Sequence, residues 1–247
     1  MKQPLADLPE EARRITTAAA DGDVTLRITG GVAIGLRCPS AARPPLHREY
    51  ADIDCVSSGR QRQEATALFE RLGYQPDPAF NAINGQSRLF FWDTANDRQL
   101  DVFVDKVHMC HKIDLRGRLD TDPQTLSLAD LLLMKLQIVE TNHKDLIDIL
   151  ALLTDHPFTQ DESGINLAYL AGLAGDDWGL WRTTTMVAER ADRLARELDG
   201  FTGAGLVHER VRDYLQTLED VPKSRGWKLR ARLGDRKRWY ELPEEND

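Results

Sequence analysis

The sequence predicts an α/β (α+β) fold, in which a small mixed sheet with flanking helices is followed by a mainly helical C-terminal region. Four short runs rich in β-branched and aromatic residues lie between residues 24 and 104, with helical segments and turns between them. After Pro123 the apolar residues instead recur at the helical period. The 247 residues are enough for two domains, each with its own core. We therefore expect a sheet-containing domain over 1–123 and a helical domain over 124–247 that packs on it.

Each element of the first part has a local signal. We expect a helix over 9–20, a strand over 24–29, a helix over 32–36, a strand over 51–57, a helix over 60–72, and strands over 87–92 and 99–104. Gly73 fits the C-cap of the helix before it, because glycine readily adopts the left-handed conformation that ends many helices. Residues 75–87 are rich in turn formers and are read as a loop.

The second part reads as a series of helices. The expected segments cover 127–140 and 143–153, followed by two amphipathic helices around 180–198 and 207–218. The net charge is −8, but residues 222–240 carry eight Lys or Arg and one Asp, a local charge of +7. The remainder therefore carries −8 − 7 = −15. This basic tail also contains aromatic residues, a combination used in single-stranded RNA binding. A terminal helix that docks its tryptophans on the core is the alternative.

Several bulk features limit the class of protein. No apolar run reaches the ~18 residues that a membrane span needs, and the N-terminus lacks the apolar region of a secretory signal. The three cysteines form an odd and scattered set, which reduced thiols explain most simply. We expect a cytoplasmic protein without a membrane partner.

Asp52 and Asp54 carry the strongest chemical signal. Residues i and i+2 of a strand point to the same side, so their carboxylates are expected to project together. Two such charges repel unless a cation lies between them, and Mg²⁺ prefers oxygen ligands. Asp101 on a later strand supplies a third acid, and the Gly30-Gly31 turn offers backbone N–H groups to a phosphate. The alternative is a simple glycine turn with surface acids paired to Arg48 or Lys106.

Charged residues also interrupt two apolar helices. Lys135 lies within LLLMKLQIV, and Asp145 and Asp148 lie within DLIDILALL on one helix face. Burying an unpaired charge costs several kcal/mol, so these groups should pair or contact a ligand. Two interpretations stay open: a structural ion pair between adjacent helices, or Lys135 reaching a triphosphate while Asp145 orients Lys135 or the acceptor.

Four motifs in this order resemble the DNA polymerase β-like nucleotidyltransferase superfamily. The likeness covers roughly residues 24–153 and is closest to the bacterial branch of abortive-infection and MenT-type nucleotidyltransferase toxins. The motifs are GGVAIGL (30–36), REYADIDCV (48–56), LDVFV (100–104) and KLQIVETNHKDLIDILAL (135–152). Many superfamily members have Gly-Ser where this chain has Gly30-Gly31, so one hydroxyl contact to phosphate is missing.

The resemblance implies a magnesium-dependent enzyme that transfers a nucleoside monophosphate from an NTP to an acceptor hydroxyl and releases pyrophosphate. It implies that Asp52, Asp54 and Asp101 hold the metal, with Asp101 also polarising or deprotonating the acceptor. The implied nucleotide-binding residues are Gly30, Gly31, Arg48 and Lys135, with Asp145 beside Lys135.

The expected partners are therefore an NTP, an RNA such as tRNA as acceptor and, for a toxin, an antitoxin protein. A nucleotidyltransferase for an antibiotic or another small molecule is the first alternative. A non-catalytic nucleotide-binding protein with the same fold is the second, and a structural α/β protein with salt-bridged acids is the third.

Overall fold

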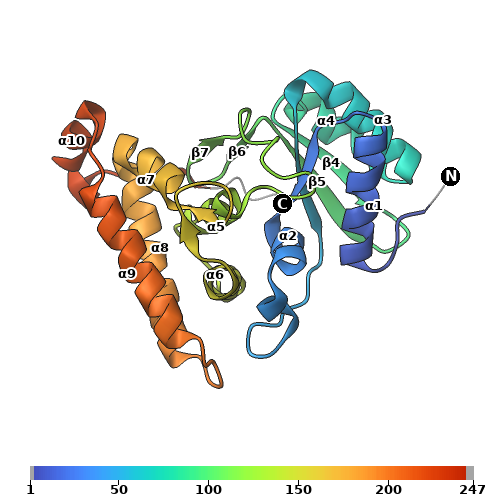
Figure 1. The fold of residues 1–247 in the computed structure, drawn as a ribbon. Coiled ribbons are helices and arrows are strands. Elements are labelled where there is room, and N and C mark those ends of the chain that lie inside the picture. The colour runs from blue at the N-terminus through green and yellow to red at the C-terminus, as the bar shows by residue number, and fades with distance from the viewer. Residues whose placement is uncertain (1–2, 243–247) are drawn as a thin grey trace. The chain divides into compact units, whose positions relative to one another are not determined.

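A computed structural model describes residues 3–242, whose contacts divide into two compact units. The first unit comprises Met1–Arg37, Glu49–Val107 and Ile113–Ser127, and the second comprises Cys38–Arg48, His108–Lys112 and Leu128–Asp247. The first contains a five-stranded sheet and the second is mainly helical, so the predicted mixed α/β class is confirmed (Figure 1). The sequence suggested a single boundary after residue 123. In the structure the segments Cys38–Arg48 and His108–Lys112 also belong to the helical unit. The predicted outer limits, 1 and 247, lie outside the described residues.

The sheet of the first unit has the order β1-β2-β5-β4-β3. Its strands are β1 (Leu26–Thr29), β2 (Ile53–Ser57), β3 (Gln75–Pro76), β4 (Arg88–Asp93) and β5 (Arg98–Val104). β2 and β5 pair in parallel, whereas the other neighbours are antiparallel. The sheet is therefore mixed, as the sequence predicts. Its one parallel pair requires a crossover, here supplied by residues 58–97.

One face of this sheet carries an aromatic and aliphatic core. Ile53 and Cys55 are buried there, as the alternation predicts. Helices α1 (Leu8–Asp21) and α3 (Arg62–Leu72) pack together beside the sheet, and Gly73 ends α3 at φ +97° as predicted (Figure 1). The ring of Phe69 lies 5.0 Å from that of Phe91, centroid to centroid, and both residues are fully buried.

Two short helices accompany the strands of this unit, and the sequence misplaces both. Helix α2 (Gly30–Arg37) begins at Gly30, two residues before the predicted start. Helix α4 (Pro78–Asn84) lies within the stretch read as a loop. The side chain of Asp77 caps α4 by accepting the Phe80 N–H, and Pro78 fits the first turn because its missing N–H needs no partner there. This Asp-Pro pair was an available signal for the helix.

The second unit is built around two long helices, α8 (Trp178–Glu197) and α9 (Ala204–Asp220), which lie side by side (Figure 1). The other helices are α5 (Leu128–Leu136), α6 (His143–Asp155), α7 (Leu167–Asp176) and α10 (Arg225–Ala231). Helix α5 stops four residues before its predicted end, and α7 was not predicted. The short elements are β6 (Lys106–His108), β7 (Lys112–Asp114), β8 (Phe158–Thr159), β9 (Ile165–Asn166), η1 (Pro39–Ala42), η2 (Gly59–Gln61) and η3 (Gly234–Arg236).

Substitution of Phe69 by Ala should lower the free energy of unfolding by about 3–5 kcal/mol, because it leaves a cavity against Phe91. Urea unfolding measures the change. Ile83→Ala is the control in the same unit: this side chain is 81% exposed, and its loss should cost no more than ~0.5 kcal/mol. Equal effects of the two changes would contradict the proposed core.

Candidate functional site

Two carboxylates meet on neighbouring strands of the first unit. Asp54 of β2 is the register partner of Asp101 of β5 in the parallel pair. Paired residues of adjacent strands project to the same face, so both side chains lie opposite the Phe69 core. Asp54 is half-buried and Asp101 is buried. The structure thus brings together these two predicted site residues at the start of β2.

The glycine turn lies directly against one of these acids. Gly30 has φ +66°, a backbone conformation that L-residues other than glycine rarely adopt. A Cβ built on Gly30 would lie 2.1 Å from Asp54 Oδ2, so only glycine permits this approach. Gly31 follows within the first turn of α2, where backbone N–H groups favour an anion. Of the predicted glycine pair, the structure thus places Gly30 directly against Asp54.

A buried hydroxyl accompanies the glycine turn. Thr29 is the register partner of Asp54 in the antiparallel β1–β2 pair and is 3% exposed. Within the described part of the chain its Oγ1 has no hydrogen-bond partner. Thr29 is not among the site residues predicted from the sequence, although it directly precedes Gly30 and its side chain carries a hydroxyl that can form a hydrogen bond.

Arg88 is the cation that faces Asp101. Its Nε donates a hydrogen bond of 2.6 Å to Asp101 Oδ1. Burial raises the pKa of Asp101, the hydrogen bond and charge of Arg88 lower it, and nearby Asp52 adds to the rise; the net pKa lies above its ordinary value. The observed partner of Asp101 is thus Arg88, whereas the alternative considered from the sequence paired the acids with Arg48 or Lys106. Arg48 pairs with Asp148 and Lys106 with Asp114.

Asp52 differs from its predicted setting. Strand β2 begins at Ile53, so Asp52 precedes the strand and is exposed, and the same-side argument does not hold for it. It still lies near enough to raise the pKa of Asp101. Among residues 3–242, no group of three His, Cys, Asp or Glu side chains is arranged to hold a metal ion. The predicted set of three carboxylates is not preassembled, because Asp101 faces Arg88 and Asp52 extends into solvent.

The chemistry of Asp54 and Asp101 nevertheless fits a hard cation. Both offer carboxylate oxygens, the ligand type that Mg²⁺ selects. The Asp54 carboxylate fills the space beside Gly30 that a Cβ would need, so the glycine is what allows this acid to lie against the turn. Asp52, Asp54 and Asp101 are the residues that would hold such an ion.

The remaining predicted residues form a cluster within the second unit. Lys135 Nζ lies 2.7 Å from Asp145 Oδ1 and 2.9 Å from Asp148 Oδ2. Arg48 binds the same Asp148 with two hydrogen bonds of 2.8 and 2.9 Å. Burial disfavours the charged form of Lys135, but Asp148 and Asp145 outweigh it and raise its pKa. The ion pair considered from the sequence is formed, and the four charges cancel.

The basic tail docks its tryptophans on α8. The ring of Trp227 lies 5.3 Å from that of Trp181, and the ring of Trp239 lies 5.9 Å from that of Trp178. Trp239 Nε1 also donates to Thr183 Oγ1 at 3.0 Å. Trp227 and Trp239 therefore pack on the protein itself, as the alternative with a docked terminal helix predicts. The exposed cations of the tail are Arg225, Lys228, Arg232, Arg236, Lys237 and Arg238.

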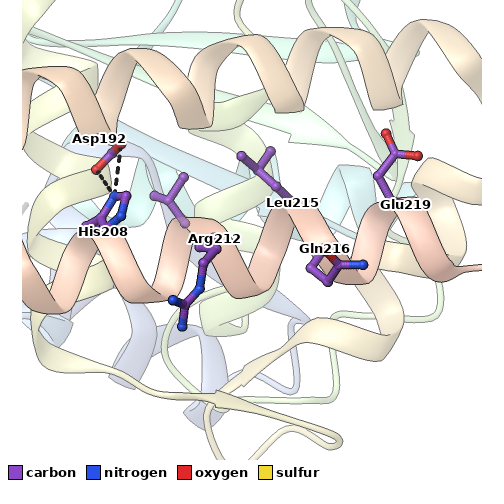
Figure 2. A pocket seen from close by; sticks show the side chains of 7 residues that line it. Asp192, His208, Arg212, Leu215, Gln216 and Glu219 are labelled. Atoms are coloured by element: carbon purple, nitrogen blue, oxygen red, sulfur yellow. Dashed lines mark hydrogen bonds and ion pairs between the residues drawn. The ribbon is translucent and has the colours of Figure 1, made fainter.

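Two cavities lie in the second unit. One, of about 270 Å³, opens between α8 and α9, where Asp192 Oδ1 and His208 Nδ1 are 3.1 Å apart (Figure 2). The other, of about 300 Å³, lies beside Trp178 and Trp239 and includes Arg230. The guanidinium of Arg230 is 4.5 Å from the ring centroid of Trp178, so a cation already occupies that aromatic face. Neither cavity contains a predicted site residue.

Comparison with known proteins adds no relative: no family model matches the chain, and no curated protein matches it in sequence. No helix within the described range is both long and apolar enough to cross a membrane. Cys38, Cys55 and Cys110 are buried, and no disulfide joins them within the described residues.

Substitution of Gly30 by Ala should destabilise the protein more than substitution of Gly200 by Ala. Both glycines have positive φ, so both variants lose about 1–2 kcal/mol to backbone strain. Gly200 has nothing within 4 Å of an added Cβ, whereas at Gly30 the Cβ meets Asp54. The clash should add about 1–3 kcal/mol, measured as the difference between the two unfolding curves. Equal losses would mean that Asp54 does not lie against Gly30.

Substitution of Asp148 by Ala should lower the free energy of unfolding by about 3–5 kcal/mol, because it removes the buried carboxylate that Arg48 and Lys135 share. Chemical denaturation at pH 7 measures this loss. Asp213→Ala removes an Asp that is 62% exposed and should cost less than ~1 kcal/mol. A small loss for Asp148→Ala would indicate that water or another residue replaces the carboxylate.

Proposed function

We propose that this chain is a magnesium-dependent nucleotidyltransferase of the DNA polymerase β-like superfamily, transferring a nucleoside monophosphate from an NTP to an acceptor hydroxyl. The observation that carries the proposal is the parallel register that sets Asp54 beside Asp101, with Gly30 against Asp54. Acids on adjacent strands next to a glycine turn and a helix N-terminus are suited to a metal and a phosphate. The motif resemblance supports the same assignment.

In the proposed reaction, the acceptor oxygen attacks the α-phosphorus in line and pyrophosphate leaves. Asp101 takes the hydroxyl proton, a role open to a carboxylate within hydrogen-bond reach of the acceptor. Gly30 and Gly31 bind the triphosphate through the backbone at the start of α2. When bound to Asp52, Asp54 and Asp101, Mg²⁺ supplies charge neutralisation at the phosphate oxygens.

In this proposal Lys135 binds phosphate, as the motif resemblance implies, and Asp145 orients Lys135. The observed ion pairs of Lys135 show what must change for it to bind phosphate. Lys135 contacts two carboxylates, so a phosphate contact requires it to give up one of them. Arg48, proposed to act on the nucleotide, is likewise bound to Asp148.

The acceptor in this proposal is an RNA such as tRNA, which the exposed cations of the tail support by charge. A cytoplasmic location and an antitoxin partner belong to the same toxin-like proposal. A small-molecule acceptor such as an antibiotic is the alternative substrate.

A second candidate function is favoured by one observation. Arg88 already neutralises Asp101, so the acids can be structural and the protein non-catalytic. A protein of this kind either binds an NTP without releasing pyrophosphate, or binds none.

Substitution of Asp54 by Asn should reduce nucleotide transfer at least about 100-fold, because the neutral amide keeps the shape but loses the anionic ligand. Each α-labelled NTP is incubated with enzyme, Mg²⁺ and total cellular RNA, or with small-molecule acceptors. Labelled tRNA identifies the acceptor as well as the reaction.

Asp199→Asn, an exposed Asp far from β2 in sequence, should retain full activity. Undiminished transfer by Asp54→Asn would refute the assignment of the acid. Absence of transfer and of any Mg²⁺-dependent thermal shift with NTP in the wild-type chain would favour the structural alternative.

A further inference from the structure

Arg88 reaches Asp101 diagonally across the β4–β5 pair. The residue directly opposite Asp101 is Phe90, and the one opposite Arg88 is Phe103. Diagonal neighbours on one face of a sheet are ~7–8 Å apart at the backbone, within reach of a long side chain. The contact therefore follows from the register, and it brings a cation from β4 to the acid beside Asp54.

The guanidinium of Arg88 is held by aromatic rings as well as by the acid. Its central carbon lies 5.8 Å from the ring centroid of Phe80 in α4 and 5.4 Å from that of Phe103 in β5. A planar cation on aromatic faces gains electrostatic and packing energy. These rings limit the positions that Arg88 can adopt, and through the 2.6 Å hydrogen bond they limit those of the Asp101 carboxylate.

A second arginine–aspartate pair on the same hairpin offers a direct comparison. Asp93 accepts bonds on both oxygens: Oδ2 from Arg98 and Asn96, and Oδ1 from the backbone of Ala95 and Asn96. Arg98 also donates to the carbonyls of Leu5 and Ala6. Every acceptor of that carboxylate is used, and both side chains are nearly inaccessible. This pair has the bonding of a structural ion pair.

The Asp101 carboxylate is bonded differently. Among the described residues, Arg88 is its one side-chain hydrogen-bond partner, and the bond is to Oδ1. Oδ2 is left to another ligand, in a side chain that otherwise has little contact with solvent. A carboxylate that is fixed through one oxygen and keeps the other available has the geometry of a supported metal ligand or proton acceptor.

We propose that Arg88 is a positioning residue for the proposed nucleotidyl transfer, fixing Asp101 through Oδ1 so that Oδ2 is presented to a divalent cation beside Asp54. The inference rests on the proposed function and deepens it. It assigns to Arg88 a role that neither its sequence position nor the motif resemblance indicates.

The test measures Mn²⁺ binding to the full chain at fixed pH, by the electron paramagnetic resonance of free Mn²⁺. Arg88→Lys retains the charge but loses the planar fork and its stacking. It should weaken Mn²⁺ binding about 10-fold, and Arg88→Gln about 10–100-fold. Unchanged binding in both variants overturns the proposal. Tighter binding by Arg88→Gln also overturns it, since Arg88 would then act as a counter-ion that competes with the metal.

Two controls separate positioning from stability and charge. Arg98→Gln breaks the structural pair and should lower Tm while leaving Mn²⁺ affinity unchanged at temperatures where it is folded. Arg60→Gln removes an exposed cation of the same unit and should change neither quantity. If Arg98→Gln does not fold, the Mn²⁺ affinities of the Arg88 variants, compared with those of Arg60→Gln and wild type, still show whether Arg88 positions Asp101.

Asp54→Asn distinguishes failure of this inference from failure of the proposed function. Loss of Mn²⁺ binding in Asp54→Asn places the ion at the acids, and unchanged binding in both Arg88 variants then refutes the positioning role alone. If the wild-type chain binds no Mn²⁺, or if Asp54→Asn binds it normally, the metal assignment itself is refuted and the positioning role with it.

Discussion

The parallel pairing of β2 with β5 is the constraint on which the candidate site depends. It joins Asp54 to Asp101, residues that are separated in the sequence by the helices α3 and α4 and the strands β3 and β4. Two carboxylates on adjacent strands repel, so the pairing is tolerable only where neighbouring groups offset the charge. Arg88 does so for Asp101, and Asp54 lies against the glycine that begins α2. The β2–β5 register therefore explains why a cation lies beside Asp101 and why only glycine fits beside Asp54.

In the second unit, buried charges are likewise offset by neighbouring groups of opposite charge. Lys135 and Arg48 bring two positive charges into a largely apolar environment, and Asp145 and Asp148 bring two negative ones. Each charge is costly to bury alone, but together they sum to zero. The free energy of such a cluster is sensitive to the loss of one member. For the same reason, Lys135 can bind a phosphate only if its ion pairs with Asp145 and Asp148 are weakened or exchanged.

Several features of the candidate site could be predicted from the sequence. The alternation of β2 places Ile53 and Cys55 in the core and Asp54 on the other face, and helical periodicity brings Asp145 and Asp148 to one side of α6. The strand that was predicted to contain both Asp52 and Asp54 begins only at Ile53, so alternation along β2 does not determine the direction of Asp52. Strand ends depend on which backbone groups find partners, and a local pattern does not contain that information.

The sequence by itself determined the mixed fold class, most strands, the acids and the helix charges, because these follow from periodicity and residue chemistry over a few positions. Only the tertiary structure decided which charges meet. Arg48 pairs with Asp148, 100 residues away in the sequence, and the register of the β4–β5 hairpin brings Arg88 to Asp101. Charge alone would allow several other arginines to pair with either acid. The choice depends on strand register and helix packing, which the whole chain fixes.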